Sequence, residues 1–220
     1  MLRFGIIAEG VTDQYVIENI LLGYFEHLEE PAILPIQPPP GGAGGWVRVL
    51  QSLERGDHEG ALQFSSDYVI IQIDTDVSEQ RGYDVPWREE GRELSVPELV
   101  RRVVERLKRA ISPAFYAANR ARILFAVAVH ETECWLMPLL HNDSKATKIT
   151  GCTAAVNHAL LGRKSNPLVR GGEKQKAAYD EASAGYRRRK TLLAQGARNP
   201  SLKLFLDQLE RIGPADPAAD

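Results

Sequence analysis

Short apolar runs recur along the chain, each bounded by polar or turn-forming residues. They cover residues 2–8, 32–36, 68–76 and 122–129. Runs of four to eight apolar residues without strict alternation indicate strands that are buried on both faces, as in a parallel sheet. The run over 68–76 is apolar up to residue 73 except for Gln72 and then ends in polar residues, and we take it as the central strand.

Segments with helical spacing of apolar residues separate these runs. Helices are predicted over 13–28, 46–55, 95–111 and 153–161, over 171–193 as one or two helices, and from Asn199 onward. In the helix over 46–55 the expected buried residues are Trp46, Val47, Leu50 and Leu53. Residues 77–94 are polar and read as a loop. The alternation of strands and helices predicts an α/β fold, a mostly parallel sheet with helices on both faces.

Acidic residues follow three of the predicted strands. Glu9 ends the first, with Asp13 at the start of the next helix, Asp74 and Asp76 end the central strand, and Glu133 follows the strand over 122–129. Ligands of open α/β sheets bind beyond the carboxyl ends of the strands, so these side chains are expected to share one crevice. Carboxylates gathered there repel one another unless a cation such as Mg²⁺ or Mn²⁺ binds. The alternative for any one pair is a turn cap.

The charge divides the chain into an acidic and a basic part. Residues 1–140 hold 13 Lys and Arg against 21 Asp and Glu, whereas 141–212 hold 14 against 6. We therefore expect an α/β domain over 1–140, a basic helical extension over 141–212 packed on it, and a disordered tail over 213–220. This split suits metal chemistry on a polyanion, although a solvated basic helix explains it equally well.

Two cysteines, Cys134 and Cys152, form neither a zinc-binding spacing nor a disulfide framework. The first ten residues have too short an apolar run for a signal peptide, and no stretch approaches ~20 apolar residues. These features predict a soluble cytoplasmic protein. The proline- and glycine-rich segment over 38–45 lacks a Walker or dinucleotide-binding pattern and is expected to be a flexible loop, or else a backbone lip near a phosphate.

The acidic motifs together resemble those of a known family. Glu9-Gly10-x-Thr12-Asp13, Asp74-x-Asp76 and Glu133-Cys134-Trp135-Leu136 are similar to the motifs of Toprim domains, and most of all to the OLD (overcoming lysogenization defect) nucleases and the small stand-alone RloB-like proteins. The resemblance covers residues 1–140 well and the basic remainder only loosely.

The resemblance implies a Toprim-like fold and a Mg²⁺- or Mn²⁺-dependent phosphodiester-cleaving site, with a role in phage or plasmid defence. Glu9, Asp74 and Asp76 match catalytic positions, and these three with Asp13 and Glu133 match metal ligands. DNA or RNA is the implied substrate. The chain has no Walker A motif, so any coupling to ATP hydrolysis requires a separate ATPase partner.

Other residues have a functional and a structural interpretation. A cation near the phosphate is expected, with Lys145, Lys148 and Lys164 as candidates. His130 is expected to be hydrogen-bonded beside the site rather than a ligand, and Glu131 to point away from Glu133. Trp135, Tyr179 and Tyr186 are expected in the core, the alternative for the tyrosines being base stacking near the basic run over 187–190.

Two other functions compete with the nuclease. A glycosyltransferase would use Asp74-x-Asp76 to hold Mn²⁺ and a sugar nucleotide, but it has no need of Glu9 at the end of the first strand. A non-catalytic module derived from a Toprim domain would bind metal, nucleic acid or a partner. Metal-dependent cleavage of a plasmid separates the three functions.

Overall fold

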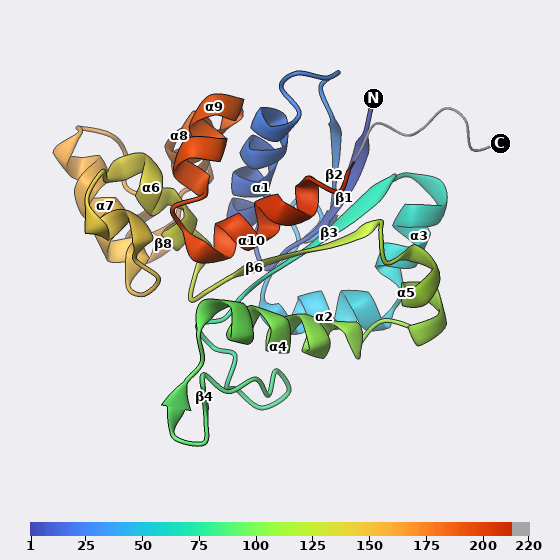
Figure 1. Cartoon of the computed structure of the whole chain (residues 1–220). Helices are drawn as coiled ribbons and strands as arrows, with labels where there is room; N and C mark the ends of the chain where they lie inside the picture. Colours follow the sequence, from blue (N-terminus) through green and yellow to red (C-terminus); the bar gives the residue numbers. More distant parts are fainter. Residues whose placement is uncertain (213–220) are drawn as a thin grey trace.

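A four-stranded parallel sheet with the order β2-β1-β3-β6 forms the centre of the protein (Figure 1). Its strands are β1 (Arg3–Ile7), β2 (Ala32–Gln37), β3 (Tyr68–Asp74) and β6 (Ile123–Ala128). The computed structural model describes residues 1–212, and the tail expected to be disordered lies outside the described residues. The prediction of an α/β fold with a parallel sheet is confirmed.

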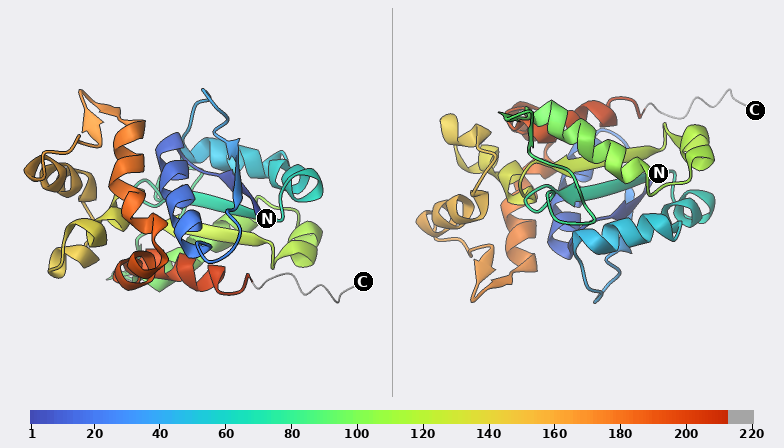
Figure 2. Two further views of the ribbon diagram at one scale, coloured as in Figure 1. Left: turned by 90° about the horizontal axis from the view of Figure 1, so that it is seen from above. Right: turned by 90° about the horizontal axis from the view of Figure 1, so that it is seen from below.

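Both faces of the sheet are covered by helices, which explains why β1, β3 and β6 are continuous apolar runs, whereas the edge strand β2 is mostly not buried (Figure 2). Along β3, Ile70 belongs to the core on one face, whereas Val69 and Ile71 belong to the core on the other. Side chains of a strand alternate between its two faces, so a strand between two helical layers has no solvated side. All six residues of β6 are buried.

One helical layer consists of helices from both ends of the chain. It contains α1 (Val11–Tyr24), α8 (Lys176–Ser183) and α10 (Pro200–Leu209). The other layer contains α2 (Trp46–Glu54), α3 (Asp57–Phe64), α4 (Val96–Lys108) and α5 (Pro113–Asn119). A capping box starts α4, because the Glu98 carboxylate accepts from the backbone N–H of Ser95 at 2.8 Å.

The remaining helices lie between β6 and α10 in the chain. They are the helices η1 (Thr132–Leu136), α6 (Met137–Leu140), η2 (Ser144–Thr147), α7 (Cys152–Gly162), η3 (Ala184–Arg187), α9 (Arg189–Thr191) and η4 (Leu192–Gly196). Two hairpins complete the structure, β4 (Arg88–Glu89) with β5 (Arg92–Glu93), and β7 (Val169–Arg170) with β8 (Glu173–Lys174). In the part of the chain that the structure describes, no helix is both long and apolar enough to cross a lipid bilayer.

The structure corrects several predicted elements. The first helix runs from residue 11 to 24 instead of 13–28, and the segments that form α3 and α5 were not predicted as helices. In α2 it is Val49 that is buried, whereas Val47 is 45% exposed, because the helix is rotated relative to the expected apolar face. The loop over 77–94 contains the β4–β5 hairpin, and the expected helix over 171–193 starts inside the β7–β8 hairpin.

The helix α10 covers the free edge of β6. The side-chain amide of Gln208 accepts from the backbone N–H of Phe125 at 2.9 Å and donates to its carbonyl at 2.8 Å. The Ser201 hydroxyl accepts from the N–H of Val129 at 3.3 Å. These side chains replace the partner strand that β6 lacks on this side. The apolar residues of α10 that face the core, Leu202, Phe205, Leu206 and Leu209, are all buried.

Gly23 gives a test of the close packing between α1 and η3. A Cβ atom at this position would overlap the backbone carbonyl oxygen of Tyr186, so one of the two segments must move. We expect Gly23→Ala to lower the free energy of unfolding by about 1–3 kcal/mol, the usual cost of overpacking. Gly60→Ala is the matched control, because a Cβ there meets no atom within 4 Å and alanine favours the interior of α3. Urea unfolding of both variants measures the difference; equal stabilities would contradict the close contact.

Candidate active site

The site lies between two neighbouring strands from which the chain continues in opposite directions, from β1 to β2 and from β3 to β6. β1 has β2 on one side and β3 on the other, which makes the gap between the carboxyl ends of β1 and β3 the topological switch point. Glu9 follows β1 and Asp74 ends β3, so both reach this gap. A pocket of about 300 Å³ opens there, and its acidic lining residues are Glu9, Asp13, Asp74 and Asp76.

Gln72 joins the two strand ends. Its side-chain oxygen accepts from the backbone N–H of Glu9 at 2.9 Å, and its nitrogen donates to Asp74 Oδ1 at 2.8 Å. Glu9 Oε2 accepts in turn from the backbone N–H of Asp74 at 2.9 Å. The one polar residue within the apolar part of the central run therefore joins the backbone of Glu9 to the carboxylate of Asp74.

Asp13 and Thr132 add contacts from α1 and η1. The Thr132 hydroxyl donates to Asp74 Oδ1 at 2.9 Å and accepts from Gln72 Nε2 at 3.0 Å. Asp13 lies in the first turn of α1, where the helix N-terminus favours negative charge, and is 2% exposed. Its Oδ1 atom is buried without a hydrogen-bond partner.

The fifth predicted acid, Glu133, is held by residues of the basic extension. Its Oε1 atom lies 2.9 Å from the ammonium group of Lys174 and accepts a hydrogen bond from the Tyr179 hydroxyl. The other oxygen, Oε2, is buried without a partner. Lys174 also lines the acidic pocket, so it links Glu133 to the other four carboxylates.

Lys174 replaces the lysines that we expected near the site. Lys145, Lys148 and Lys164 are exposed, and none of the three lines the acidic pocket. Lys174 lies at the end of the β7–β8 hairpin, whose turn residues Gly171 and Gly172 both have positive φ angles. A hairpin turn of this kind favours glycine, and the Gly-Gly pair is the sequence signal that the prediction of a helix over 171–193 overlooked.

Burial is the main cause of the altered acidities in the pocket. It raises the pKa of Glu9 to about 7, with help from Asp13 and Asp76 and against the hydrogen bond from the Asp74 backbone. Burial likewise raises the pKa of Asp13 to about 6 and that of Asp74 well above its usual range. For Lys174, burial disfavours the charged form, but Asp13 and Glu133 outweigh it and raise its pKa.

The donor atoms fit a hard divalent cation. All are carboxylate oxygens, and two buried oxygens, one from Asp13 and one from Glu133, have no partner in the protein. The acids do not converge on a single point: among residues 1–212, the one trio of potential ligands whose atoms all lie within 4.8 Å of one another is Glu131, Cys134 and Cys152. An ion in the acidic pocket would thus retain part of its water shell, as Mg²⁺ usually does.

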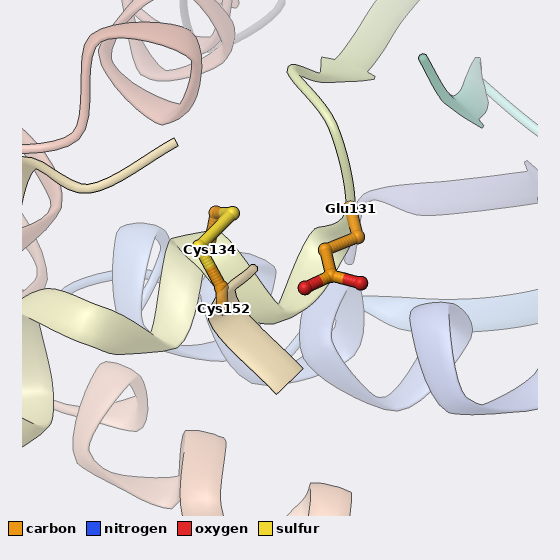
Figure 3. Close-up of side chains that lie close together, drawn as sticks. All are labelled: Glu131, Cys134 and Cys152. Carbon is orange, nitrogen blue, oxygen red and sulfur yellow. A yellow bond between two sulfur atoms is a disulfide. The ribbon is translucent and has the colours of Figure 1, made fainter. Parts of the chain in front are cut away.

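The cysteine prediction is wrong, because Cys134 and Cys152 form a disulfide (Figure 3). They are 18 residues apart and belong to η1 and α7, so only the tertiary fold brings their Cα atoms to 5.0 Å. Glu131 points away from Glu133, as expected. Its carboxylate accepts from the backbone N–H of Thr153 in α7 at 2.6 Å, and Glu131 does not line the acidic pocket.

The aromatic residues near the site belong to the core, as expected. Trp135, Tyr179 and Tyr186 are fully buried, which excludes stacking of bases on the tyrosines. His130 has a positive φ of 67°, and its backbone N–H donates to the Thr75 hydroxyl at 2.7 Å, but its Nδ1 atom is buried without a partner. The expected hydrogen bond of His130 is therefore made by its backbone N–H and not by the ring atom Nδ1.

The basic run over 187–190 is partly structural. Arg187 donates to Asn19 Oδ1 at 2.5 Å and pairs with Asp180 at 2.6 Å. The Arg189 guanidinium lies 4.7 Å from the ring centroid of Tyr24. Both arginines thereby fasten the extension to α1, so the run as a whole is not a free surface for phosphates.

No protein-family profile, no curated protein and no solved structure matches the chain. The site is therefore defined by its own geometry, as an acidic pocket at the switch point of a parallel α/β sheet, with one lysine, Lys174, among its lining residues.

Glu9 gives a test of the electrostatic strain in the metal-free pocket. Its pKa in the folded protein, about 7, lies above the ordinary value of 4.5. The folded state therefore holds a proton that the unfolded state loses, so ionisation of Glu9 removes stability as the pH rises from about 4.5 to 7. In EDTA at pH 8 we expect Glu9→Gln to raise the free energy of unfolding by about 1–3 kcal/mol, with a smaller gain at pH 5.

The control for this experiment is Glu54→Gln, which changes an exposed glutamate of α2. Urea unfolding at both pH values gives the comparison. A Glu9→Gln variant that is less stable than the wild type at pH 8 would show that the ionised carboxylate is not a burden on the metal-free fold.

Proposed function

We propose that the protein is a divalent-metal-dependent nuclease of the Toprim and OLD type, which hydrolyses phosphodiester bonds of DNA or RNA in the acidic pocket. The observation that supports this most strongly is that Glu9, Asp13, Asp74 and Asp76 line one pocket together with Lys174. A catalytic carboxylate set with a nearby cation suits attack on a phosphate, where negative charge increases in the transition state.

In this proposal Asp13, Asp74, Asp76, Glu9 and Glu133 hold Mg²⁺ or Mn²⁺. The unpartnered oxygens of Asp13 and Glu133 support a ligand role, because a buried carboxylate oxygen without a partner is costly. When bound, the metal supplies charge stabilisation at the phosphate and an acidified water. Gln72 and Thr132 orient Asp74 from behind, as outer partners of metal ligands commonly do.

Two residues have further roles in the proposed reaction. Glu9, with a pKa of about 7, is suited to accept a proton from the attacking water near neutral pH. Lys174 is suited to neutralise charge on a phosphate oxygen. Its position depends on Glu133 and Tyr179, since Glu133 Oε1 binds both the Lys174 ammonium and the Tyr179 hydroxyl.

The second candidate function is a non-catalytic binding module, and one contact favours it. The Lys174–Glu133 ion pair at 2.9 Å already places a positive charge among the acids, as a protein without bound metal requires. A glycosyltransferase that uses Asp74 and Asp76 is the third candidate. For the proposed nuclease we keep phage or plasmid defence as the context and a separate ATPase as a partner for any ATP-dependent step. The disulfide removes the argument for the cytoplasm that the cysteines gave.

The acidic pocket is tested by Asp74→Asn. The amide keeps the shape of the side chain but removes the charge that holds a divalent ion, so we expect Mg²⁺-dependent plasmid or RNA cleavage to fall by roughly 100-fold or more. Asp84→Asn is the matched control, because Asp84 is exposed and does not line the pocket. Thermal melting in Mn²⁺ accompanies the assay: the wild type should gain stability from the ion and Asp74→Asn should gain less.

Cleavage by the wild type in EDTA, or full activity of Asp74→Asn, would refute the nuclease proposal. Stabilisation by Mn²⁺ without cleavage of any nucleic acid would favour the binding module, and hydrolysis of a sugar nucleotide would favour the glycosyltransferase.

The role of Lys174 is tested by comparing Lys174→Gln with Lys148→Gln. Loss of the Lys174 ammonium should lower kcat by roughly 100-fold if it stabilises the transition state, whereas Lys148, which does not line the pocket, should be replaceable. Removing Lys174 also leaves Glu133 without its ion pair, so the variant should be less stable in EDTA and recover stability in Mn²⁺. An unchanged kcat would remove Lys174 from the reaction.

A further inference from the structure

A second set of potential metal ligands contains residues that neighbour Glu133 in the sequence. It differs from the acidic pocket because two of its three ligand atoms are cysteine sulfurs. Cys134 directly follows Glu133, and its sulfur is bonded to that of Cys152. The Glu131 carboxylate lies beside the two sulfurs, and one ligand atom from each of the three residues lies within 4.8 Å of the others (Figure 3). None of the three lines the acidic pocket.

The fold holds the three residues from two separate elements. Glu131 precedes η1 as its N-cap, Cys134 lies within η1, and Cys152 is the first residue of α7. The hydrogen bond from the backbone N–H of Thr153 to Glu131 Oε1, 2.6 Å long, joins the start of α7 to the segment before η1. The carboxylate is therefore held near the sulfurs by a contact that does not involve the disulfide.

Reduction changes what this group can bind. Two molecules of a low-molecular-weight thiol convert the disulfide into two cysteine thiols and become joined to each other as a disulfide. Each cysteine sulfur gains one electron and one proton in this exchange. The products are two buried thiols beside one carboxylate, and loss of the two protons to solvent leaves two soft thiolate ligands and one oxygen ligand.

We propose that the reduced protein binds a thiophilic divalent cation such as Zn²⁺ through Cys134, Cys152 and Glu131. Zinc accepts cysteine sulfur at about 2.3 Å and carboxylate oxygen at about 2.1 Å, and three protein ligands leave its fourth position for water. Sulfurs that share one ion lie further apart than bonded sulfurs, and rotation about the Cα–Cβ bonds of both cysteines separates them. In the oxidised protein the same sulfurs are bonded to each other and cannot bind the ion as thiolates.

The surroundings suit a site with negatively charged ligands. The N-terminus of α7, a helix of 11 residues, faces Cys152 and Glu131 and stabilises their negative charge. Glu131 is half-buried while both cysteines are fully buried, so the carboxylate lies on the side from which an ion can enter. The Thr153 N–H occupies one carboxylate oxygen and leaves the second available, in the manner of an outer partner that orients a ligand.

Cobalt(II) is the probe that separates this site from the acidic pocket. It replaces zinc in tetrahedral sites, and bonds to thiolate sulfur give an intense near-ultraviolet charge-transfer absorption that oxygen ligands do not give. The full-length protein is reduced, freed of reductant under anaerobic conditions and titrated with Co²⁺, and free thiols are counted in denaturant before and after. We expect this absorption to saturate at one ion per chain in the reduced protein only, and to disappear when Zn²⁺ is added.

Variants assign the signal to the three residues. Cys152→Ser should abolish the absorption, and Glu131→Gln should weaken Co²⁺ binding roughly tenfold or more, with Glu173→Gln as the control at an exposed glutamate. Asp74→Asn should leave the absorption unchanged, so failure of this site and failure of the proposed nuclease are seen separately. If Cys152→Ser does not fold, the Co²⁺ affinity of the reduced Glu131→Gln variant still tests the proposal. Two titratable thiols without charge-transfer absorption, or the same Co²⁺ affinity with and without Glu131, would overturn the proposal.

Discussion

Carboxylates that are buried beside the carboxyl ends of β1 and β3 have little solvent to screen their charges. Asp13 and Asp74 are almost completely buried, and Glu9 lies against the backbone of Asp74. The desolvation of so many like charges is unfavourable unless protons, a lysine or a bound cation balance them. Two features of the structure meet that requirement. Gln72 and Thr132 donate hydrogen bonds to Asp74, and Lys174, from a distant part of the chain, places a positive charge beside the acids.

The basic extension is consequently part of the site and not an appendage. Lys174 and Tyr179 contact Glu133, and the apolar residues of α8 and α10 share one core with α1 and the sheet. The division of the sequence into an acidic and a basic part thus has a local meaning, because one lysine of the basic part enters the pocket of the acidic part. Most of the other basic residues have no such contact, and two of the arginines serve to attach the extension to α1.

The sequence could reveal the strands and their acids because both leave local signals. An apolar run that ends in a carboxylate indicates both the strand and the acid at its end. This signal was sufficient to predict that Glu9, Asp13, Asp74 and Asp76 share one pocket, and all four line it. The sequence did not identify Lys174 as the lysine of the pocket, because its position depends on the Gly171-Gly172 turn that pairs β8 with β7. The pairing of Cys134 with Cys152 depends on the packing of η1 against α7, which no spacing of two cysteines encodes. The metal and the reaction remain predictions.

The cover that α10 gives to β6 has a consequence for the synthesis of the protein. All four strands leave the ribosome before residue 130, whereas Gln208, which binds the free edge of β6, follows much later. During that interval the nascent sheet exposes the unpaired backbone of Phe125 and Val129, a surface that can pair with another chain. The same interval precedes the arrival of Lys174 among the acids. The nascent chain therefore has an unpaired strand edge and an incomplete pocket, because the residues that complete both are synthesised last. The edge is covered and the pocket is completed when the C-terminal part folds onto the sheet.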